Sequence, residues 1–337
     1  MLDISICLRQ ADRLKSPIQV FGQDTLKLIR VNLGFGSKMK GNNMVLGLDI
    51  GGTKISSGLF SNGGLIESLE VKTPANAPKE EILETISQQI AAYKHFDLKA
   101  IGIGIPGLVD PIHGIIYNLA NIPSFDYVNL KEYLEERFGI PVAINNDANC
   151  FALGEYKFGE AKIHKHVIGI TLGTGIGTGI IANGHLYTGR LCGAGEWGAI
   201  PYLDGTFEDY CGSKFFKERY KISAKKLSIK ASAGDDEAIA IFYEFGKHIG
   251  ALIYRLLLTF APEAIVIGGS IRKAFPYFEK GVQEVIGAFP YLPISGNLKI
   301  YVSSTNDSAI LGAISLVEEN KYLINSEENL NIPNPLV

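Results

Sequence analysis

The sequence predicts a soluble α/β protein in which one structural plan occurs twice, once in each of two lobes. Residues 45–54, VLGLDIGGTK, are typical of a β-strand that ends in an acidic residue and turns through two glycines. A second glycine run, GTGIGTG at residues 173–179, also follows an apolar strand. In both places strand, glycine turn, strand, turn and strand follow one another, which indicates a duplicated unit.

Composition and charge exclude several classes of protein. The chain has 337 residues, 46% hydrophobic and 20% charged, and is long enough for two cores. Its net charge of -3 gives no reason to expect nucleic acid or an anionic membrane as a partner. Four widely spaced cysteines form no CxxC pair, which favours a reducing cytoplasm. The most apolar run, residues 249–261, contains Arg255 and is too short to cross a bilayer, so a buried helix is expected there.

The first 43 residues differ from the rest of the chain. They carry seven Lys or Arg against three Asp, without a clear hydrophobic period, and Met44 stands directly before the first strand. We interpret residues 1–43 as an extension that is disordered or results from an over-long start. A small added helix or a targeting arm is the alternative.

The elements that follow the first strand can be read in order. Residues 55–71 are expected to form two antiparallel strands around a turn at residues 61–64, SNGG. Residues 79–93 have the apolar spacing of an amphipathic helix, and residues 98–105 form an apolar strand. Because α/β sheets bind ligands at the carboxyl ends of their strands, Gly107 just beyond this strand is a candidate site residue.

Polar residues gather after the next strand. Asn121 lies in a polar loop, where asparagine serves either a turn or a hydroxyl-rich ligand. The strand at residues 141–144 ends in NNDAN, residues 145–149. One of these side chains is expected to cap a helix over residues 150–158, but the cluster exceeds what a cap requires. We therefore expect a substrate site here, with Asp147 as the candidate base.

The glycine turns have the chemistry of a phosphate site. Gly51 and Gly52 leave room for an approaching phosphate, while Thr53 and Lys54 supply a hydroxyl donor and a positive charge. The second loop neither enters a helix as a Rossmann GxGxxG does nor ends in GK[ST], so a nucleotide held between the lobes is expected instead. The candidates in the second loop are Gly173, Thr174, Gly175 and Gly177.

The last part of the chain adds a third strand-to-glycine turn. The strand at residues 264–267 ends in Gly268 and Gly269, which either lie under an adenine ring or allow close helix packing. Residues 191–216 read as a loop rich in acids. A long helix is expected over residues 237–260, and the last helix is expected to begin at Ser308.

Taken together, these motifs resemble those of the ROK family (repressors, open reading frames and sugar kinases) of the actin-like ATPase superfamily. The resemblance covers about residues 44–318, and the motifs occur in the family's order. They are Asp49 to Lys54, Asn146 to Asn149, Leu172 to Gly179, and Gly268 to Ser270. The resemblance implies the duplicated α/β fold of actin-like ATPases, which is ribonuclease H-like. The implied parts are a small lobe at 44–147 joined by a C-terminal helix at 307–322, a large lobe at 148–306, and a tail at 323–337.

The resemblance also implies a function. The chain would be an ATP-dependent kinase for a hexose or amino sugar, with glucose or N-acetylglucosamine as the leading substrates. Asp147 would accept the proton of a sugar hydroxyl, Asp49 would orient Mg2+ through water, and a homodimer is implied. The residues implied for sugar binding are Asn146, Glu196, Glu208, Asn121 and Gly107. The residues implied for ATP binding are Asp49, Gly51, Gly52, Thr53, Lys54, Gly173, Thr174, Gly175, Gly177, Gly268 and Gly269.

One departure from the family pattern affects both metal and substrate. Residues 195–198, Gly-Glu-Trp-Gly, match the pattern, but Ala199 stands where many members have a histidine. The cysteine triplet of their structural zinc site is also missing, so no zinc site is expected. Losing the histidine removes a hydrogen-bonding group from the sugar pocket, and such a loss can shift discrimination by a few kcal/mol.

Two other functions stay open. A sugar-responsive transcriptional regulator is one, although residues 1–43 lack two clean amphipathic helices with a turn. A catalytically inert sugar-binding protein is the other, and it is motivated by Ala199. The presence of Asp147 and of both glycine loops weighs against an inert protein.

Overall fold

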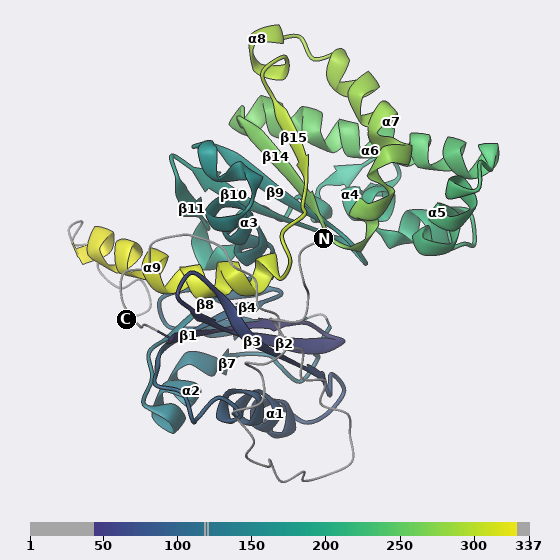
Figure 1. Ribbon diagram of the computed structural model, residues 1–337. Helices are drawn as coiled ribbons and strands as arrows, with labels where there is room; N and C mark the ends of the chain where they lie inside the picture. Colours follow the sequence, from purple (N-terminus) through teal and green to yellow (C-terminus); the bar gives the residue numbers. More distant parts are fainter. Residues whose placement is uncertain (1–43, 118, 120, 329–337) are drawn as a thin grey trace, which may run out of the picture.

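The computed structural model describes residues 44–117, 119 and 121–328, and it has two lobes with two helices between them (Figure 1). The predictions for residues 1–43 and 329–337 lie outside the described residues. Among the residues described, no helix combines the length and the apolar character that crossing a bilayer requires.

The first lobe is built on a sheet with the strand order β3-β2-β1-β4-β8. β2 and β3 are antiparallel to their neighbours, whereas β1, β4 and β8 run parallel. Helices α1 and α2 cover one face of this sheet, and the last helix covers the other (Figure 1). The bounds are β1 Met44–Ile50, β2 Lys54–Ser61, β3 Gly64–Lys72, α1 Lys79–Ala91, β4 Leu98–Ile105, α2 Leu130–Phe138 and β8 Val142–Asn146.

The second lobe repeats this topology. Its sheet has the order β11-β10-β9-β14-β15, with an antiparallel hairpin pair on one side and parallel strands on the other. The two sheets therefore match strand for strand, which confirms the duplicated plan. The bounds are β9 Val167–Leu172, β10 Ile176–Ala182, β11 His185–Tyr187, β14 Ala264–Gly268 and β15 Lys299–Val302.

Helices pack against the second sheet and make the largest buried cluster of the described residues. The long helix α6, Asp236–Phe260, buries one apolar stripe against β9 and β14, as its sequence period predicts. Two helices that were not expected, α5 and α7, flank it (Figure 1). The remaining bounds are α4 Phe207–Cys211, α5 Ala224–Ser232, α7 Phe275–Gly287 and α8 Leu292–Ser295.

Two helices lie between the lobes, α3 (Asp147–Phe158) and α9 (Ser308–Glu328) (Figure 1). Glycines bring their backbones unusually close: a Cβ on Gly102 would lie 1.8 Å from the Ala313 carbonyl oxygen, and one on Gly312 would lie 1.7 Å from the Cys150 carbonyl oxygen. α9 is thus packed on both β4 and α3.

Three boundaries differ from the expectations. α3 begins at Asp147 rather than at residue 150, because Asn146 supplies the cap. α9 continues to Glu328, so residues 323–328 belong to a helix and not to a tail. Residues 191–216 are not a plain loop: they contain short 3-10 turns, the hairpin of β12 (Pro201–Tyr202) and β13 (Gly205–Thr206), and α4.

A small sheet lies beside the carboxyl end of β4. It has the order β5-β6-β7, with bounds Leu108–Asp110, Ile115–Tyr117 and Val128–Asn129. The 3-10 turn η3, Arg190–Cys192, packs against β5.

Candidate active site

The first glycine turn is held by hydrogen bonds from the end of β3. The Gly51 amide donates to the Lys54 carbonyl oxygen at 2.9 Å, which closes the turn. Thr73 Oγ1 donates to the Gly51 carbonyl at 2.6 Å, and the Thr73 amide donates to the Thr53 carbonyl at 3.1 Å. These bonds fix the backbone of the predicted phosphate loop.

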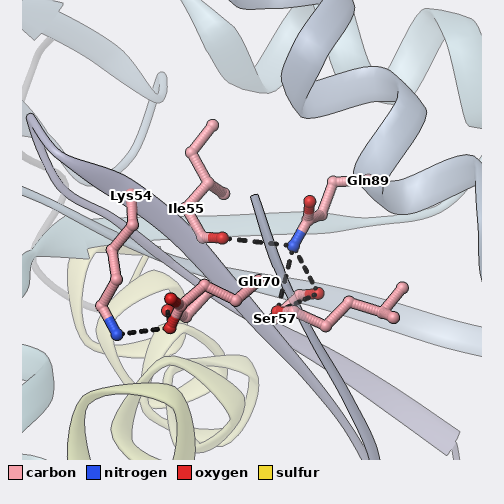
Figure 2. Close-up of polar contacts among 7 residues, drawn as sticks. Lys54, Ile55, Ser57, Glu70 and Gln89 are labelled. Carbon is pink, nitrogen blue, oxygen red and sulfur yellow. Dashed lines mark hydrogen bonds and ion pairs between the residues drawn. The ribbon is translucent and has the colours of Figure 1, made fainter. Parts of the chain in front are cut away.

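Lys54, the predicted phosphate ligand, already has an anionic partner. Its Nζ lies 2.5 Å from the Glu70 carboxylate, and both side chains are about half exposed (Figure 2). The buried Gln89 of α1 donates from its side-chain amide to two groups of β2, the Ile55 carbonyl and Ser57 Oγ (Figure 2). Gln89 thus ties α1 to β2, the strand that carries Lys54.

Asn146 joins two of the predicted sugar-binding segments. Its Oδ1 accepts from the amide of Ala148 at 2.9 Å and caps α3. Its Nδ2 donates to the Gly107 carbonyl at 3.1 Å, so Gly107 and Asn146 lie together. Behind them, Asn145 Oδ1 accepts from the Asn146 amide at 2.8 Å and from Asn149 Nδ2 at 2.9 Å. The NNDAN segment is therefore a preorganised turn.

Asp147 is the first residue of α3 and lies beside the end of β4. Its Cα is 3.6 Å from the position of a Cβ on Gly104, and its carboxylate accepts from the Ala148 amide at 2.8 Å. Burial raises the pKa of the Asp147 carboxyl, and the hydrogen bond from Ala148 opposes this rise.

Asp49 lies within electrostatic reach of Asp147. Burial raises the pKa of the Asp49 carboxyl to about 7, the charge of Asp147 adds to the rise, and Lys54 opposes it. Asp49 near the end of β1 and Asp147 directly after β8 thus lie at the same carboxyl edge of the sheet, with β4 between the two strands.

Glu196 and Glu208 complete an acidic group. Desolvation raises the pKa of Glu196, and the charges of Asp147 and Glu208 raise it further. Glu208 lies on α4 against the second glycine loop, because a Cβ on Gly175 would be 2.0 Å from Glu208 Oε2. The structure therefore brings acids from both lobes to one place. A group of like charges of this kind is typical of functional sites.

The second glycine loop is fixed from α4 and the segment after it. The Ser213 amide donates to the carbonyl oxygens of Gly173 at 2.9 Å and Thr174 at 3.2 Å. Gly269 lies against the base of the same loop: its φ is +77°, and a Cβ there would be 2.2 Å from the Leu172 carbonyl oxygen. The predicted adenosine turn and the second phosphate loop are thus neighbours.

Asn121 packs on the first glycine turn, and Trp197 packs toward the core of the second lobe. A Cβ on Gly52 would lie 2.7 Å from the Cβ of Asn121, so Asn121 packs on the first phosphate loop. Trp197 follows Glu196 but packs toward the core, with its ring centroid 6.2 Å from that of Phe260.

Asp307 belongs to this neighbourhood and was not expected. It precedes α9 with a φ of +55°, its charge adds to the raised pKa of Asp49, and Lys54 lies within electrostatic reach of it. Its place after the last parallel strand was the sequence signal that could have found it.

Metal-ligating clusters were sought throughout the described residues. In residues 44–117, 119 and 121–328, no group of three or more His, Cys, Asp or Glu side chains is arranged to hold a metal ion. Ala199 is exposed at the end of a 3-10 turn. Its own amide donates to the Glu196 carbonyl at 3.2 Å. The expectation that the chain lacks a zinc site stays a prediction.

Comparison with known proteins agrees with this geometry. A model of the ROK family matches residues 45–320. The glucokinase of Thermotoga maritima is 30% identical over 313 residues, covering 82% of this chain and 97% of that protein. The xylose repressor of Bacillus subtilis is 29% identical over 298 residues, covering 81% of this chain and 76% of that protein.

Solved structures give the same result for the fold. A ROK family glucokinase from Streptomyces griseus, crystallised with glucose and AMPPNP, superposes with a TM-score of 0.70 at 29% identity, covering 81% of this chain and 99% of that one. The predicted actin-like ATPase fold class is confirmed by this match and by the repeated sheets. On this fold, this site and these matches, the chain belongs to the ROK family.

Proposed function

We propose that the protein phosphorylates a hexose or amino sugar with ATP, and that Asp147 is the general base. The observation that carries the proposal is the grouping of Asp147 with Asn146 and Glu208 beside two hydrogen-bonded glycine loops. Relatives that bear the names glucokinase and N-acetyl-D-glucosamine kinase support a sugar as the acceptor.

Asp147 has the properties that a base for a sugar hydroxyl requires. Burial disfavours its charged form, so the carboxylate gains from accepting a proton as the hydroxyl oxygen attacks phosphorus. The oxygen–phosphorus bond to the sugar forms while the bond between the β- and γ-phosphates breaks, and ADP leaves with the electron pair. Asn146, held by its bonds to Gly107 and Ala148, presents a fixed amide next to the base.

The glycine loops supply the room and the donors for the triphosphate. Side chains on Gly52 or Gly175 would collide with Asn121 or Glu208, so backbone alone forms these surfaces. Lys54 would exchange part of its contact with Glu70 for a phosphate.

Asp49 has the chemistry of a residue that helps to hold magnesium. Its carboxylate offers the oxygen atoms that Mg2+ prefers, and repulsion from Asp147 disfavours the charged carboxylate unless a cation is near. We assign Asp49 to orient Mg2+, through water, and the bound ion would neutralise charge on the phosphates. Gly269 would lie under the adenine. Gly268 fits the alternative of close packing, because it is buried and a Cβ there would lie 2.3 Å from the Phe151 ring.

Four residues are assigned to the sugar. They are Asn121, Glu196, Glu208 and Gly107. Ala199 cannot make the hydrogen bond of the family histidine, so a preference for glucose is not assumed. Assays with a panel of sugars decide which sugar the protein prefers. The proposal includes a homodimer, which the family resemblance supports. It also includes a cytoplasmic location, which is supported by three buried, free cysteines among the described residues.

The test is ADP release from ATP and magnesium across hexoses and N-acetylhexosamines, with the full chain. Asp147→Asn removes the base and keeps its shape, while Asp236→Asn changes an exposed aspartate at the start of α6. We expect turnover with at least one sugar, a fall of roughly 10²–10⁴ in kcat for Asp147→Asn, and no change for Asp236→Asn.

Two outcomes would count against this function. Sugar-stimulated turnover that survives Asp147→Asn would refute the assignment of the base. Sugar binding in calorimetry without turnover on any sugar would favour a sugar-responsive regulator. This alternative is considered because one of the relatives is named a xylose repressor.

A further inference from the structure

The small sheet beside the site has an unusual outer face. In antiparallel strands, residues paired across the sheet project to the same side, and alternate residues face opposite sides. Val109, Ile116 and Val128 are buried, so they form the inner face. The neighbouring strand positions on the outer face hold Leu108 and Tyr117, and Tyr127, the residue before β7, lies beside them because its ring contacts that of Tyr117.

These three outer residues form one row, which we call the aromatic row. Leu108 pairs with Tyr117 across β5 and β6, and the rings of Tyr117 and Tyr127 contact edge to face with centroids 5.7 Å apart. Leu108 is 36% exposed and Tyr127 is 67% exposed. An outer face normally carries polar residues, so a row of apolar and aromatic groups indicates a binding surface.

The backbone at Tyr127 supports this interpretation. Its φ is +52°, in the left-handed region that a bulky residue rarely occupies. The strained conformation places an exposed ring beside Tyr117, where burial gives it little compensation. Strain of this kind is commonly kept at ligand sites.

The aromatic row begins next to the proposed sugar site. Leu108 directly follows Gly107, whose carbonyl accepts from Asn146 Nδ2 at 3.1 Å. On the other side, Leu108 lies against Gly193, the residue after η3, since a Cβ on Gly193 would lie 3.4 Å from its Cδ2. Cys192 of η3 is in turn hydrogen-bonded to the Asn146 backbone.

The chemistry of the row matches a carbohydrate. Tyrosine rings offer flat apolar surfaces to the C–H face of a pyranose, and their hydroxyl groups can bond to sugar hydroxyls at the edge. Exposed Arg190 lies within electrostatic reach of Tyr117 and adds hydrogen-bond donors. Strands lie about 4.8 Å apart, so the row extends about 10 Å away from Gly107, which gives space for one more ring.

We propose that the aromatic row binds a second sugar ring, linked through a glycosidic bond to the ring that is phosphorylated, so that disaccharides are substrates. This inference rests on the proposed function, because it extends the same site. The reaction is unchanged: one hydroxyl of the first ring forms a bond to the γ-phosphorus, ADP leaves, and the proton goes to Asp147.

The test compares monosaccharides with disaccharides in the same kinase assay. Cellobiose and maltose are the probes, with glucose and N-acetylglucosamine as references. We expect wild-type turnover of at least one disaccharide. Tyr117→Ala and Tyr127→Ala should each lower its kcat/KM roughly three- to tenfold, the size expected for loss of one aromatic contact, and leave the monosaccharide value within about twofold.

Two variants serve as controls. Tyr127→Phe keeps the ring and should keep most of the disaccharide activity. Tyr187→Ala removes another exposed tyrosine, on β11 of the second lobe, and should change neither substrate.

Several outcomes would overturn the proposal. One is a wild-type enzyme that phosphorylates monosaccharides but no disaccharide, and another is an equal loss on both substrates in the tyrosine variants. A change in oligomeric state without any effect on sugars would identify the aromatic row as a subunit contact. If no sugar at all is phosphorylated, the kinase function fails. Calorimetric binding of the same disaccharides then decides, with loss in Tyr117→Ala supporting the surface and unchanged binding refuting it.

Discussion

Replacing Asp49 with asparagine tests the electrostatics of the site in one step. The folded protein raises the pKa of this carboxyl from its ordinary value of 3.8 to about 7, chiefly by burial and then by repulsion from Asp147. Between these two values the folded state binds more protons than the unfolded state. The protonated Asp49 carboxyl therefore stabilises the folded state fully below about pH 4. This stabilisation is lost as the pH rises toward 7 and stays lost at higher pH.

The magnitude follows from the width of that window. About 3 pKa units at about 1.4 kcal/mol each give about 4 kcal/mol of unfolding free energy lost by ionising Asp49. Asparagine does not ionise, so Asp49→Asn should be more stable than the wild type by up to about 4 kcal/mol near pH 8, and by less than about 1 kcal/mol near pH 4. Kinase activity should fall at least roughly tenfold because the group proposed to orient magnesium is gone.

Urea unfolding at both pH values measures this difference. Asp236→Asn is the matched control, since an exposed aspartate should change stability by no more than about 0.5 kcal/mol at either pH. A gain for Asp49→Asn that is the same at both pH values would refute the idea that an ionised, desolvated Asp49 destabilises the fold.

Three further predictions concern packing, capping and the nucleotide turn. Gly102→Ala places a Cβ 1.8 Å from the Ala313 carbonyl oxygen, so α9 must move, and urea unfolding should show a loss of about 3 kcal/mol; a loss below about 0.5 kcal/mol would contradict the close contact. Asn129→Ala removes the side-chain cap of α2 and should cost about 1 kcal/mol in thermal unfolding, whereas an unchanged midpoint would deny the cap a role. Arg272 donates to the Gly269 carbonyl at 2.9 Å, so Arg272→Ala should raise KM for ATP and not KM for the sugar; equal effects on both would count against the adenosine turn.

The sequence was sufficient where local chemistry decides the structure. Alternating apolar residues and paired glycines identified β1, β2 and the turn between them, and the repeat of that pattern predicted the matching second sheet. The second glycine loop is shorter than predicted: it spans residues 173–175, and residues 176–179 already belong to β10. The sequence was insufficient where a helix has few start signals. The residue before α7, Ala274, makes no side-chain cap bond, so Pro276 in the first turn was the local start signal that the sequence offered.

The candidate site shows the same division. One side chain of residues 145–149 was expected to cap a helix, and in the structure Asn146 does so with its oxygen while its nitrogen donates to the Gly107 carbonyl. Which of these side chains forms the cap could not be read from the sequence because several of them can accept that bond, and sugar binding by Asn146 stays a prediction. The place of Asp307 after the last parallel strand can be seen in the sequence, but its approach to Asp49, more than two hundred positions away, depends on the tertiary fold.

The position of α9 has a consequence for how the chain is made. Val45, Phe60 and Ala100 of the first sheet are buried against Ile310 and Ile314, which belong to the last helix. During translation the first sheet is synthesised before the second, and its cover α9 follows the whole second sheet. The first lobe therefore cannot finish folding until α9 has been made, and until then its apolar face stays open to nonspecific association.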